Sequence, residues 1–355
     1  MSRDIRMDSA RGLAIFGILL INIQSFAVQE AGRFDPFFQG PPSLANGLAW
    51  WLQVLLVDHR FISLFALLFG MGLAWLKSRG PLYQFRRLKW LVAFGVIHGL
   101  FIWEGDILLS YGLTAMVVLN LMDRSVLWRL RAGLGALALA LALGAVLMAL
   151  PGGEEEAVDL VLLYRDQGYG EQLLHRFLYL FFTVMAWPFS TLWWVGALML
   201  LGSALAERPH WQRQLAASWP LFLLAGLALT LPGALALWYG GAEPSDQHGL
   251  ITTLELAGPI QALGYLGFCY RHGQRLPALA AAGRWSFSHY LLQSLVMTSL
   301  SYGAWLLHPL ARWQLLLLAL GYGVLLARLS PLLVGLSEQG PMERLWRRLS
   351  RPHRE

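Results

Sequence analysis

The sequence predicts an all-α, polytopic helical membrane protein with about ten transmembrane helices and both termini on the cytoplasmic side. Its 355 residues are 57% hydrophobic and 14% charged, whereas soluble globular chains are about 45–50% apolar and about 25% charged. Apolar runs of about 20 residues recur along the chain, and each can cross about 30 Å of hydrocarbon at 1.5 Å per residue. These observations exclude an ordinary cytosolic enzyme. The single cysteine, Cys269, excludes an internal disulfide and a Cys-rich metal site.

Ten runs qualify as membrane-spanning candidates. They are residues 11–28, 54–76, 88–104, 106–122, 129–150, 180–206, 214–239, 250–270, 285–307 and 313–336. The first run contains Asn22 and lacks a small-residue cleavage site, so we interpret it as a helix and not as a cleaved signal peptide. The apolar run 44–75 contains Asp58-His59-Arg60 and is expected to divide into a short interfacial or re-entrant piece and a true span. Pro188 is expected to kink or split the run 173–206.

The loops between these runs set the expected orientation. With the N-terminus inside, most of the 27 Lys and Arg residues fall in inner segments, and the outer loops hold most acids, including Glu154, Glu155 and Glu156. We therefore expect one transmembrane domain over residues 1–355. N-terminal helices (11–122) would carry an outer polar cluster, the remaining helices would follow (129–336), and a basic cytoplasmic tail (337–355) would end the chain. Nucleic acid is not an expected partner, because the basic residues lie in short loops between apolar runs.

The outer loop 31–43 is rich in Gly, Pro and Phe. A plain connector is the favoured interpretation, and a lid over an outer cavity is the alternative.

Seven polar residues from the first four helices are expected at one depth, in the outer third of the membrane, where each needs a partner or a function. They are Asn22, Asp58, His59, Arg60, His98, Glu104 and Asp106. His98 is a candidate general base oriented by Asp106. Alternatively, His98 only bridges helices at the Gly95–Gly99 packing motif, and Asp106 only caps a helix. Arg60 is expected to pair with a carboxylate, Asp58 or Asp106.

A second polar stripe is expected in the inner half. Ser286, His289 and Gln293 share one helix face. With Arg284, Arg86 and Arg87 they could form a vestibule for a phosphorylated donor, because guanidinium groups bind phosphates. A polar seam between helices is the alternative, and orientation bias alone also places arginines inside. The phosphate-binding loop, the zinc-binding H-E-x-x-H helix and the G-x-S-x-G elbow are absent from the sequence. No metal is therefore expected.

Several stretches resemble the YeiB-like family of bacterial inner-membrane proteins of unknown function. The most specific is H-G-L-x-x-W-x-G-D-I-L-x-x-Y-G, here His98 to Gly112. Others are Asp8 to Asn22, Phe61 to Gly70, Gly283 to Gln293 and Gly340 to Arg347. The resemblance implies a multi-pass protein of the bacterial inner membrane.

That family is distantly similar to membrane acyltransferases, including the heparan glucosaminide acetyltransferases and the acyltransferase-3 proteins. The shared feature is Arg11-Gly12 followed by Asn22, and in the glucosaminide enzymes the matching asparagine belongs to the active site. Those enzymes also use a histidine in the loop after the first helix. This chain has none between Asn22 and Asp58, so His98 or His59 would have to take that role.

The resemblance thus implies an acyltransferase that moves an acyl group from cytoplasmic acyl-CoA to an extracytoplasmic sugar, lipid or envelope metabolite. Asn22 or Arg60 would stabilise the oxyanion, and Glu104 would belong to the same site. The alternative is a small-molecule transporter in which the buried ionisable residues relay a proton or substrate. The expected partners are the lipid bilayer and the acceptor, and a homodimer is left open.

Overall fold

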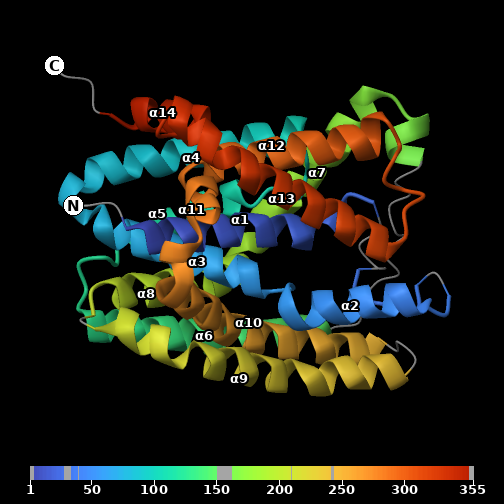
Figure 1. Cartoon of the computed structure of the whole chain (residues 1–355), viewed down its shortest axis with the longest axis horizontal. Coiled ribbons are helices and arrows are strands. Elements are labelled where there is room, and N and C mark those ends of the chain that lie inside the picture. Colours follow the sequence, from blue (N-terminus) through green and yellow to red (C-terminus); the bar gives the residue numbers. More distant parts are fainter. Residues whose placement is uncertain are drawn as a thin grey trace.

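The computed structural model describes residues 4–27, 33–38, 40–149, 162–208, 210–240 and 244–351, and all regular structure in this part of the chain is helical. The expected acidic loop segment Glu154–Glu156 lies outside the described residues. Most helices run side by side along the long axis of the molecule (Figure 1). The α-helices are α1 (Ile5–Ser25), α2 (Leu44–Leu56), α3 (Arg60–Trp75), α4 (Pro81–Phe101), α5 (Leu108–Leu119), α6 (Val126–Ala149), α7 (Tyr169–Ala186), α8 (Thr191–Ala206), α9 (Trp211–Gly240), α10 (Pro244–His272), α11 (Pro277–Arg284), α12 (Ser286–Thr298), α13 (Arg312–Leu336) and α14 (Pro341–Ser350).

Each of the ten apolar runs overlaps a helix or a pair of helices. By length and composition, four described segments can cross a membrane: Leu44–Trp75, Val126–Val146, Trp211–Gly240 and Arg312–Leu336. The bent pair Tyr169–Phe189 and Thr191–Ala206 brings the number to five if the pair forms one span. The helix α5 has only 12 residues and is shorter than the run 106–122 that predicts it. Ten crossings and the inside position of the termini stay predictions.

The two long apolar runs are broken where the sequence predicts. The first is interrupted after α2, and His59 stands in the left-handed region with φ 62° before α3 begins at Arg60. This conformation is uncommon for a residue other than glycine, so the surrounding packing must hold it. The second run bends by 61° between α7 and α8 at a short 3₁₀ turn that contains Pro188.

The helix α1 lies in the middle of the bundle (Figure 1) and contacts α3, α11, α12 and α13. Its approach to α11 is close because both helices present glycine at the contact: Gly12 faces the backbone of Leu279, and Gly283 faces the backbone of Asp8. Small residues allow this backbone approach without lost side-chain volume. The main apolar core is continuous from α1 through α3 to α8 and α10.

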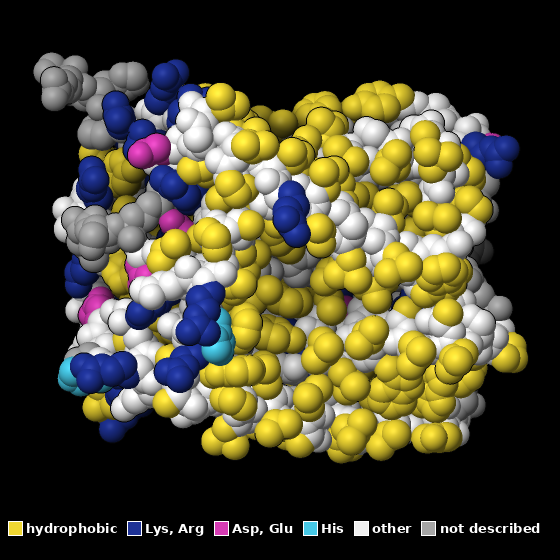
Figure 2. Space-filling view, in the orientation of Figure 1, with side chains coloured by type: hydrophobic (Ala, Val, Ile, Leu, Met, Phe, Trp, Pro, Cys, Tyr) yellow, Lys and Arg dark blue, Asp and Glu magenta, His cyan; other side chains and the backbone are white. Residues whose placement is uncertain are grey.

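The outer surface of the bundle is apolar. Only 17% of the apolar stretch of α6 is buried inside the protein, and Leu332 and Leu336 of α13 are exposed. Figure 2 shows hydrophobic side chains over most of this face of the molecule. A soluble monomer rarely exposes so large an apolar area, so this surface is suited to lipid.

Lys and Arg side chains gather at the end of the molecule where both chain termini lie (Figures 1 and 2). The segment 337–355, expected as a basic tail, forms the helix α14 within its described part. This helix packs on α4 and α12, and the buried indole of Trp346 donates a hydrogen bond to the carbonyl of Arg87 at 2.7 Å. Its arginines Arg344, Arg347 and Arg348 remain exposed.

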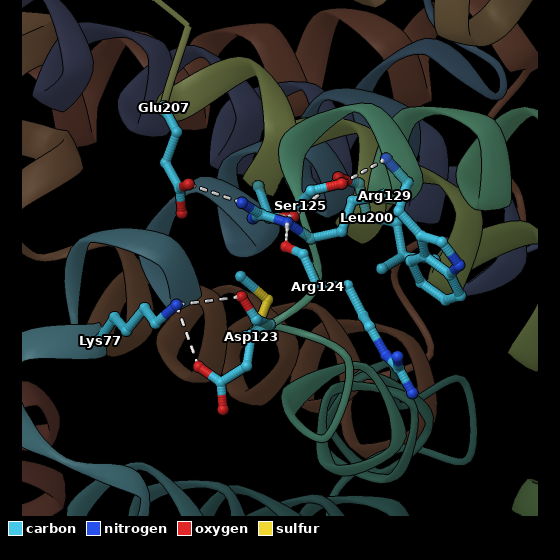
Figure 3. A network of polar contacts seen from close by, with 10 residues as sticks. Lys77, Asp123, Arg124, Ser125, Arg129, Leu200 and Glu207 are labelled. Atoms are coloured by element: carbon cyan, nitrogen blue, oxygen red, sulfur yellow. Dashed lines mark hydrogen bonds and ion pairs between the residues drawn. The ribbon is translucent and has the colours of Figure 1, made fainter.

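At this end of the molecule, the basic end, charged side chains form ion pairs and hydrogen bonds between neighbouring helices (Figure 3). The guanidinium of Arg129, which is 1% exposed, donates to the Glu207 carboxylate at 2.6 Å and to the Ser203 hydroxyl at 3.1 Å. These contacts join α6 to α8. Lys77 lies 3.0 Å from the Asp123 carboxylate, but this pair is largely exposed. Buried and hydrogen-bonded charges contribute more to stability than exposed pairs.

Replacing Arg129 with Met should lower the free energy of unfolding by about 1–3 kcal/mol, because the charge-assisted hydrogen bond to Glu207 and the bond to Ser203 are lost. Lys77→Met removes an exposed pair and should change it by less than about 0.5 kcal/mol. Thermal unfolding of both variants in the same detergent measures the difference. Equal loss in the two variants would contradict the structural role assigned to Arg129.

Candidate functional site

The hairpin of α4 and α5 brings His98 and Asp106 together. The helix α4 ends at Phe101, and the chain reverses over residues 102–107 before α5 begins. The Nδ1 atom of His98 lies 2.9 Å from Oδ1 of Asp106, and the two side chains are 1% and 0% exposed. The imidazole and the carboxylate thus form a pair that water does not reach.

Asp106 has a structural function besides this pair. Its Oδ2 accepts a hydrogen bond from the backbone N–H of Leu109 at 2.8 Å, in the first turn of α5. The carboxylate therefore binds a backbone donor that has no partner within the helix. Both sequence interpretations of Asp106, as a cap and as the partner of His98, hold in the structure. One oxygen serves each contact.

Tyr290 of α12 completes the group, and sequence reasoning did not select it. Its hydroxyl lies 3.5 Å from Oδ1 of Asp106 and accepts a hydrogen bond from the N–H of Ile107 at 3.3 Å. Its ring centroid lies 5.2 Å from that of His98. The available signal was its place beside His289, within the polar stripe of α12.

Both ring nitrogens of His98 are buried and make no well-aligned hydrogen bond to the described residues; Nδ1 faces Oδ1 of Asp106 at 2.9 Å, and Nε2 points away from it. A neutral imidazole carries one proton, and a carboxylate next to Nδ1 favours the tautomer with that proton on Nδ1. In this tautomer Nε2 has a free lone pair. The pair of His98 and Asp106 can therefore accept a proton from a bound hydroxyl or amine.

Glu104 belongs to a second polar group on the other side of the same turn. Its carboxylate accepts a hydrogen bond from the Tyr164 hydroxyl at 2.8 Å and lies 3.7 Å from Nε of Arg176. The ring of Tyr302 stacks on Tyr164 with centroids 3.8 Å apart. Burial raises the pKa of Tyr164, so its hydroxyl stays protonated and donates. Glu104 is thus neutralised by Arg176 and not by the imidazole of His98.

Arg60 belongs to a third polar group, in which its guanidinium lies next to Asp58, one of the two expected partners, and donates its hydrogen bonds to neutral acceptors. Its Nε donates to Oε1 of Gln261 at 2.9 Å, Nη1 donates to the carbonyl of Asp58 at 2.5 Å, and Nη2 donates to the Thr230 hydroxyl. These acceptors lie on α9, α10 and the turn before α3. The carboxylate of Asp58 accepts instead from Arg33 at 3.4 Å.

The polar residues predicted at one depth are divided among at least three groups: His98 with Asp106, Glu104 with Arg176, and Arg60 with Gln261 and Thr230. Residues at one depth lie on different sides of the bundle, because depth along a helix does not fix the direction of a side chain. Asn22 is half-buried on α1, and the ring of His59 packs near Trp194 with centroids 6.1 Å apart.

The residues expected to bind a phosphorylated donor have different neighbours. Arg87 stacks its guanidinium on Trp346, 3.5 Å from the ring centroid, and Arg86 donates to the carbonyl of Arg351 at 3.4 Å. Both arginines thus lie under or beside α14. Arg284 ends α11, and its buried Nε has no hydrogen-bond partner in the part of the chain that the structure describes. Arg284 is therefore the one of these three arginines whose guanidinium has a buried nitrogen without a hydrogen-bond partner among the described residues.

The polar residues of the stripe on α12 also have different surroundings. Nε2 of His289 lies 3.0 Å from the hydroxyl of Ser330 on α13, as expected for a polar seam between helices. Gln293 is buried, and its Nε2 has no hydrogen-bond partner among the residues described. Gln293 follows Tyr290 by one helical turn, so it lies near the side of α12 that faces Asp106. Within the described residues, no group of three or more His, Cys, Asp or Glu side chains is arranged to hold a metal ion.

Comparisons with known proteins agree with the sequence resemblance. A family model described as "Protein of unknown function (DUF418)" matches residues 200–352. The chain is 31% identical to "Uncharacterized protein YeiB" of Escherichia coli (strain K12), over 99% of this chain and 97% of that protein. It is also 36% identical to "Uncharacterized protein YxaH" of Bacillus subtilis (strain 168), over 32% of this chain and 31% of that protein. No solved structure matches the chain.

Gly95 makes the pair of His98 and Asp106 possible, because α4 approaches the start of α5 closely at this residue. A Cβ atom at Gly95 would lie 2.7 Å from Cα of Leu109 and 2.9 Å from Oδ2 of Asp106. Gly95→Ala should therefore lower the free energy of unfolding by about 1–3 kcal/mol. Thermal unfolding in detergent measures this loss.

Gly99→Ala is the matched control. Its Cβ would meet mainly Cδ1 of Leu180 at 3.0 Å, the end of a flexible side chain. The small clash is offset by the higher helix propensity of alanine, about 1 kcal/mol above glycine. Gly99→Ala should thus cost clearly less than Gly95→Ala, and an equal or larger cost would contradict the described contact of α4 with α5.

Proposed function

This chain belongs to the YeiB-like family, and we propose that it is a membrane-embedded acyltransferase in which His98 is the general base. The observation that carries the proposal is the buried pair of His98 and Asp106, in which Nδ1 lies 2.9 Å from the carboxylate and Nε2 has no hydrogen-bond partner among the described residues. A histidine oriented by a carboxylate in this way is suited to act as a general base. The proposed donor is acyl-CoA, and the proposed acceptor carries a hydroxyl or amine group.

The proposed reaction transfers the acyl group directly. The acceptor O–H or N–H gives its proton to Nε2 of His98 while its oxygen or nitrogen forms a bond to the thioester carbonyl carbon. The C–S bond then breaks, and the CoA thiolate takes the proton back from His98. Asp106 holds the imidazole in the required tautomer and stabilises its transient positive charge. Because both side chains are shielded from water, these electrostatic contacts are stronger than at an exposed site.

Two side-chain amides are the proposed donors to the carbonyl oxygen, which becomes negatively charged during the reaction. Gln293 supports this role because its buried Nε2 is unpartnered among the described residues and lies one turn from Tyr290. Asn22 of α1 is the second amide, carried over from the resemblance to the glucosaminide enzymes. Arg60 is not included, since its guanidinium is bound to Thr230 and Gln261.

The proposed orientation has ten crossings of the bacterial inner membrane with both termini in the cytoplasm. It is supported by the gathering of Lys and Arg at the end where both termini lie (Figure 2) and by the apolar surface beyond that end. Acyl-CoA would enter from this basic end. Arg284 is the proposed contact for its phosphates, because the buried Nε of Arg284 lacks a partner among the residues described.

A transporter is the second candidate, and the break between α2 and α3 favours it. Transporters commonly bind substrate where a membrane helix is interrupted. Here the interruption holds a buried Asp58, a buried Arg60 and the left-handed residue His59. A transporter would move its substrate without consuming acyl-CoA. The release of CoA thiol therefore separates the two candidates.

His98→Ala should lower acyl transfer by about 10²- to 10⁴-fold, the range that a general base contributes. The measurement is release of CoA thiol from acetyl-CoA by proteoliposomes that contain total bacterial membrane lipid. His59→Asn is the control, since asparagine tolerates a positive φ better than most residues. This variant should keep near wild-type turnover. The assignment of the base would be contradicted if His98→Ala kept full turnover, or if His59→Asn lost turnover and His98→Ala did not.

Arg284→Ala should raise the Kd for CoA about tenfold, which corresponds to one lost charge-assisted contact of about 1.4 kcal/mol. Isothermal titration calorimetry with CoA measures this change. Arg208→Ala removes an exposed arginine from the loop between α8 and α9 and should leave the Kd unchanged. An unchanged Kd in Arg284→Ala, or an equal change in both variants, would remove Arg284 from the donor site.

A further inference from the structure

We propose that a pocket at the end of the bundle opposite the chain termini binds a neutral sugar ring. This outer pocket has a volume of about 110 Å³, and its lining residues come from the end of α1, the segment 33–38, the start of α2 and the start of α13. Figure 1 shows these elements at the end of the bundle away from the termini. Its polar lining residues are Gln24, Asp35, Asn46 and Arg312. The segment that sequence reasoning interpreted as a connector or a lid thus contributes to the wall of a pocket.

Gln24 is the residue that points to a ligand. It is 0% exposed, it lines the outer pocket, and neither its Oε1 nor its Nε2 has a hydrogen-bond partner among the described residues. Burying a polar amide without partners is unfavourable. A ligand in the outer pocket can provide both partners, a donor to Oε1 and an acceptor from Nε2. A hydroxyl group is able to serve as either.

The charges of the outer pocket are balanced, which favours a neutral ligand. Asp35 and Arg312 have opposite charges and both line the pocket. Oδ1 of Asp35 accepts from the N–H of Phe37 at 2.7 Å, and Arg312 donates to the carbonyl of Arg33 at 3.0 Å. The carboxylate would repel a phosphate, and the guanidinium would repel an amine.

Apolar groups complete the lining. The ring of Phe38 is 41% exposed, and Pro36, Pro41 and Pro42 present saturated rings beside it. A sugar ring matches this mixed surface, because its hydroxyl edge makes paired hydrogen bonds and its C–H face packs on apolar groups. The volume is below the 300–1,000 Å³ typical of drug-sized ligands. The outer pocket therefore suits one ring or the head of a glycolipid.

The end of α1 that carries Gln24 also packs against the turn between His98 and Asp106. Gln24 is followed after two residues by Phe26, whose ring centroid lies 4.3 Å from that of Trp103. Trp103 lies in the turn between His98 and Asp106. The inference that the bound sugar is the acyl acceptor rests on the proposed function, whereas the binding of sugar to Gln24 does not.

The test is binding of methyl glucoside to the full chain in nanodiscs of phosphatidylethanolamine and phosphatidylglycerol, followed by saturation-transfer NMR without acyl-CoA. Glucosamine and glucuronate are the cationic and anionic probes. Methyl glucoside should bind better than either, and Gln24→Leu should weaken its binding at least tenfold. Gln53→Leu is the matched control, because Gln53 is an equally buried and unpartnered amide on α2 that does not line the outer pocket. This variant should bind as the wild type does.

Equal binding by Gln24→Leu and wild type, stronger binding of a charged probe, or no binding of methyl glucoside would overturn the proposal. Thermal unfolding of the two glutamine variants checks that both are folded.

A second set of nanodiscs contains glucosyl diacylglycerol. Loss of the methyl glucoside signal there identifies a lipid headgroup as the source, and an unchanged signal identifies a free sugar; both support the site. The two proposals can fail separately. If methyl glucoside binds as expected but His98→Ala and wild type release CoA equally, the acyltransferase proposal is refuted and the sugar site is not.

Discussion

The contact between the His98 imidazole and the Asp106 carboxylate determines how the centre of this bundle is built. Two ionisable side chains are shielded from water there, and each would be costly without the other. The contact requires Gly95, because only a residue without a side chain lets α4 approach the start of α5. It also requires Tyr290, which ties α12 to the same turn. The proposed chemistry uses Nε2, the ring nitrogen of His98 that does not face the carboxylate.

Buried polar groups elsewhere in the molecule also need hydrogen-bond or charge partners, and many of them find such partners on neighbouring helices. Arg60 has neutral acceptors for its guanidinium, and Arg129 has a carboxylate and a hydroxyl. These side chains are explained by the helices they join. Gln24 and Nε2 of His98 differ, because their polar atoms are buried and have no partner among the described residues, and Gln24, unlike the equally unpartnered Gln53, also lines a pocket. The two functional proposals rest on this difference between satisfied and unsatisfied groups.

The helices and the central pair could be predicted from the sequence, but the arrangement of the other polar residues could not. The apolar runs mark their helices by length, and Asp58-His59-Arg60 marks the break between α2 and α3 because charges interrupt an apolar helix. His98 and Asp106 are close in sequence on either side of one turn. Arg60, by contrast, lies at the expected depth but faces α9 and α10, a direction that depends on tertiary packing. Tyr290 is distant in sequence, so no local pattern links it to Asp106.

The most direct test of the central claim is the ¹⁵N NMR spectrum of the His98 imidazole in the purified protein, assigned by its absence in His98→Gln. The account predicts that the ring proton lies on Nδ1, toward Asp106, and that Nε2 carries none. An Asp106→Asn variant should lose this tautomer preference. A proton on Nε2 in the wild-type protein, or a spectrum unaffected by Asp106→Asn, would contradict the account, because His98 would then have no lone pair directed at an acceptor.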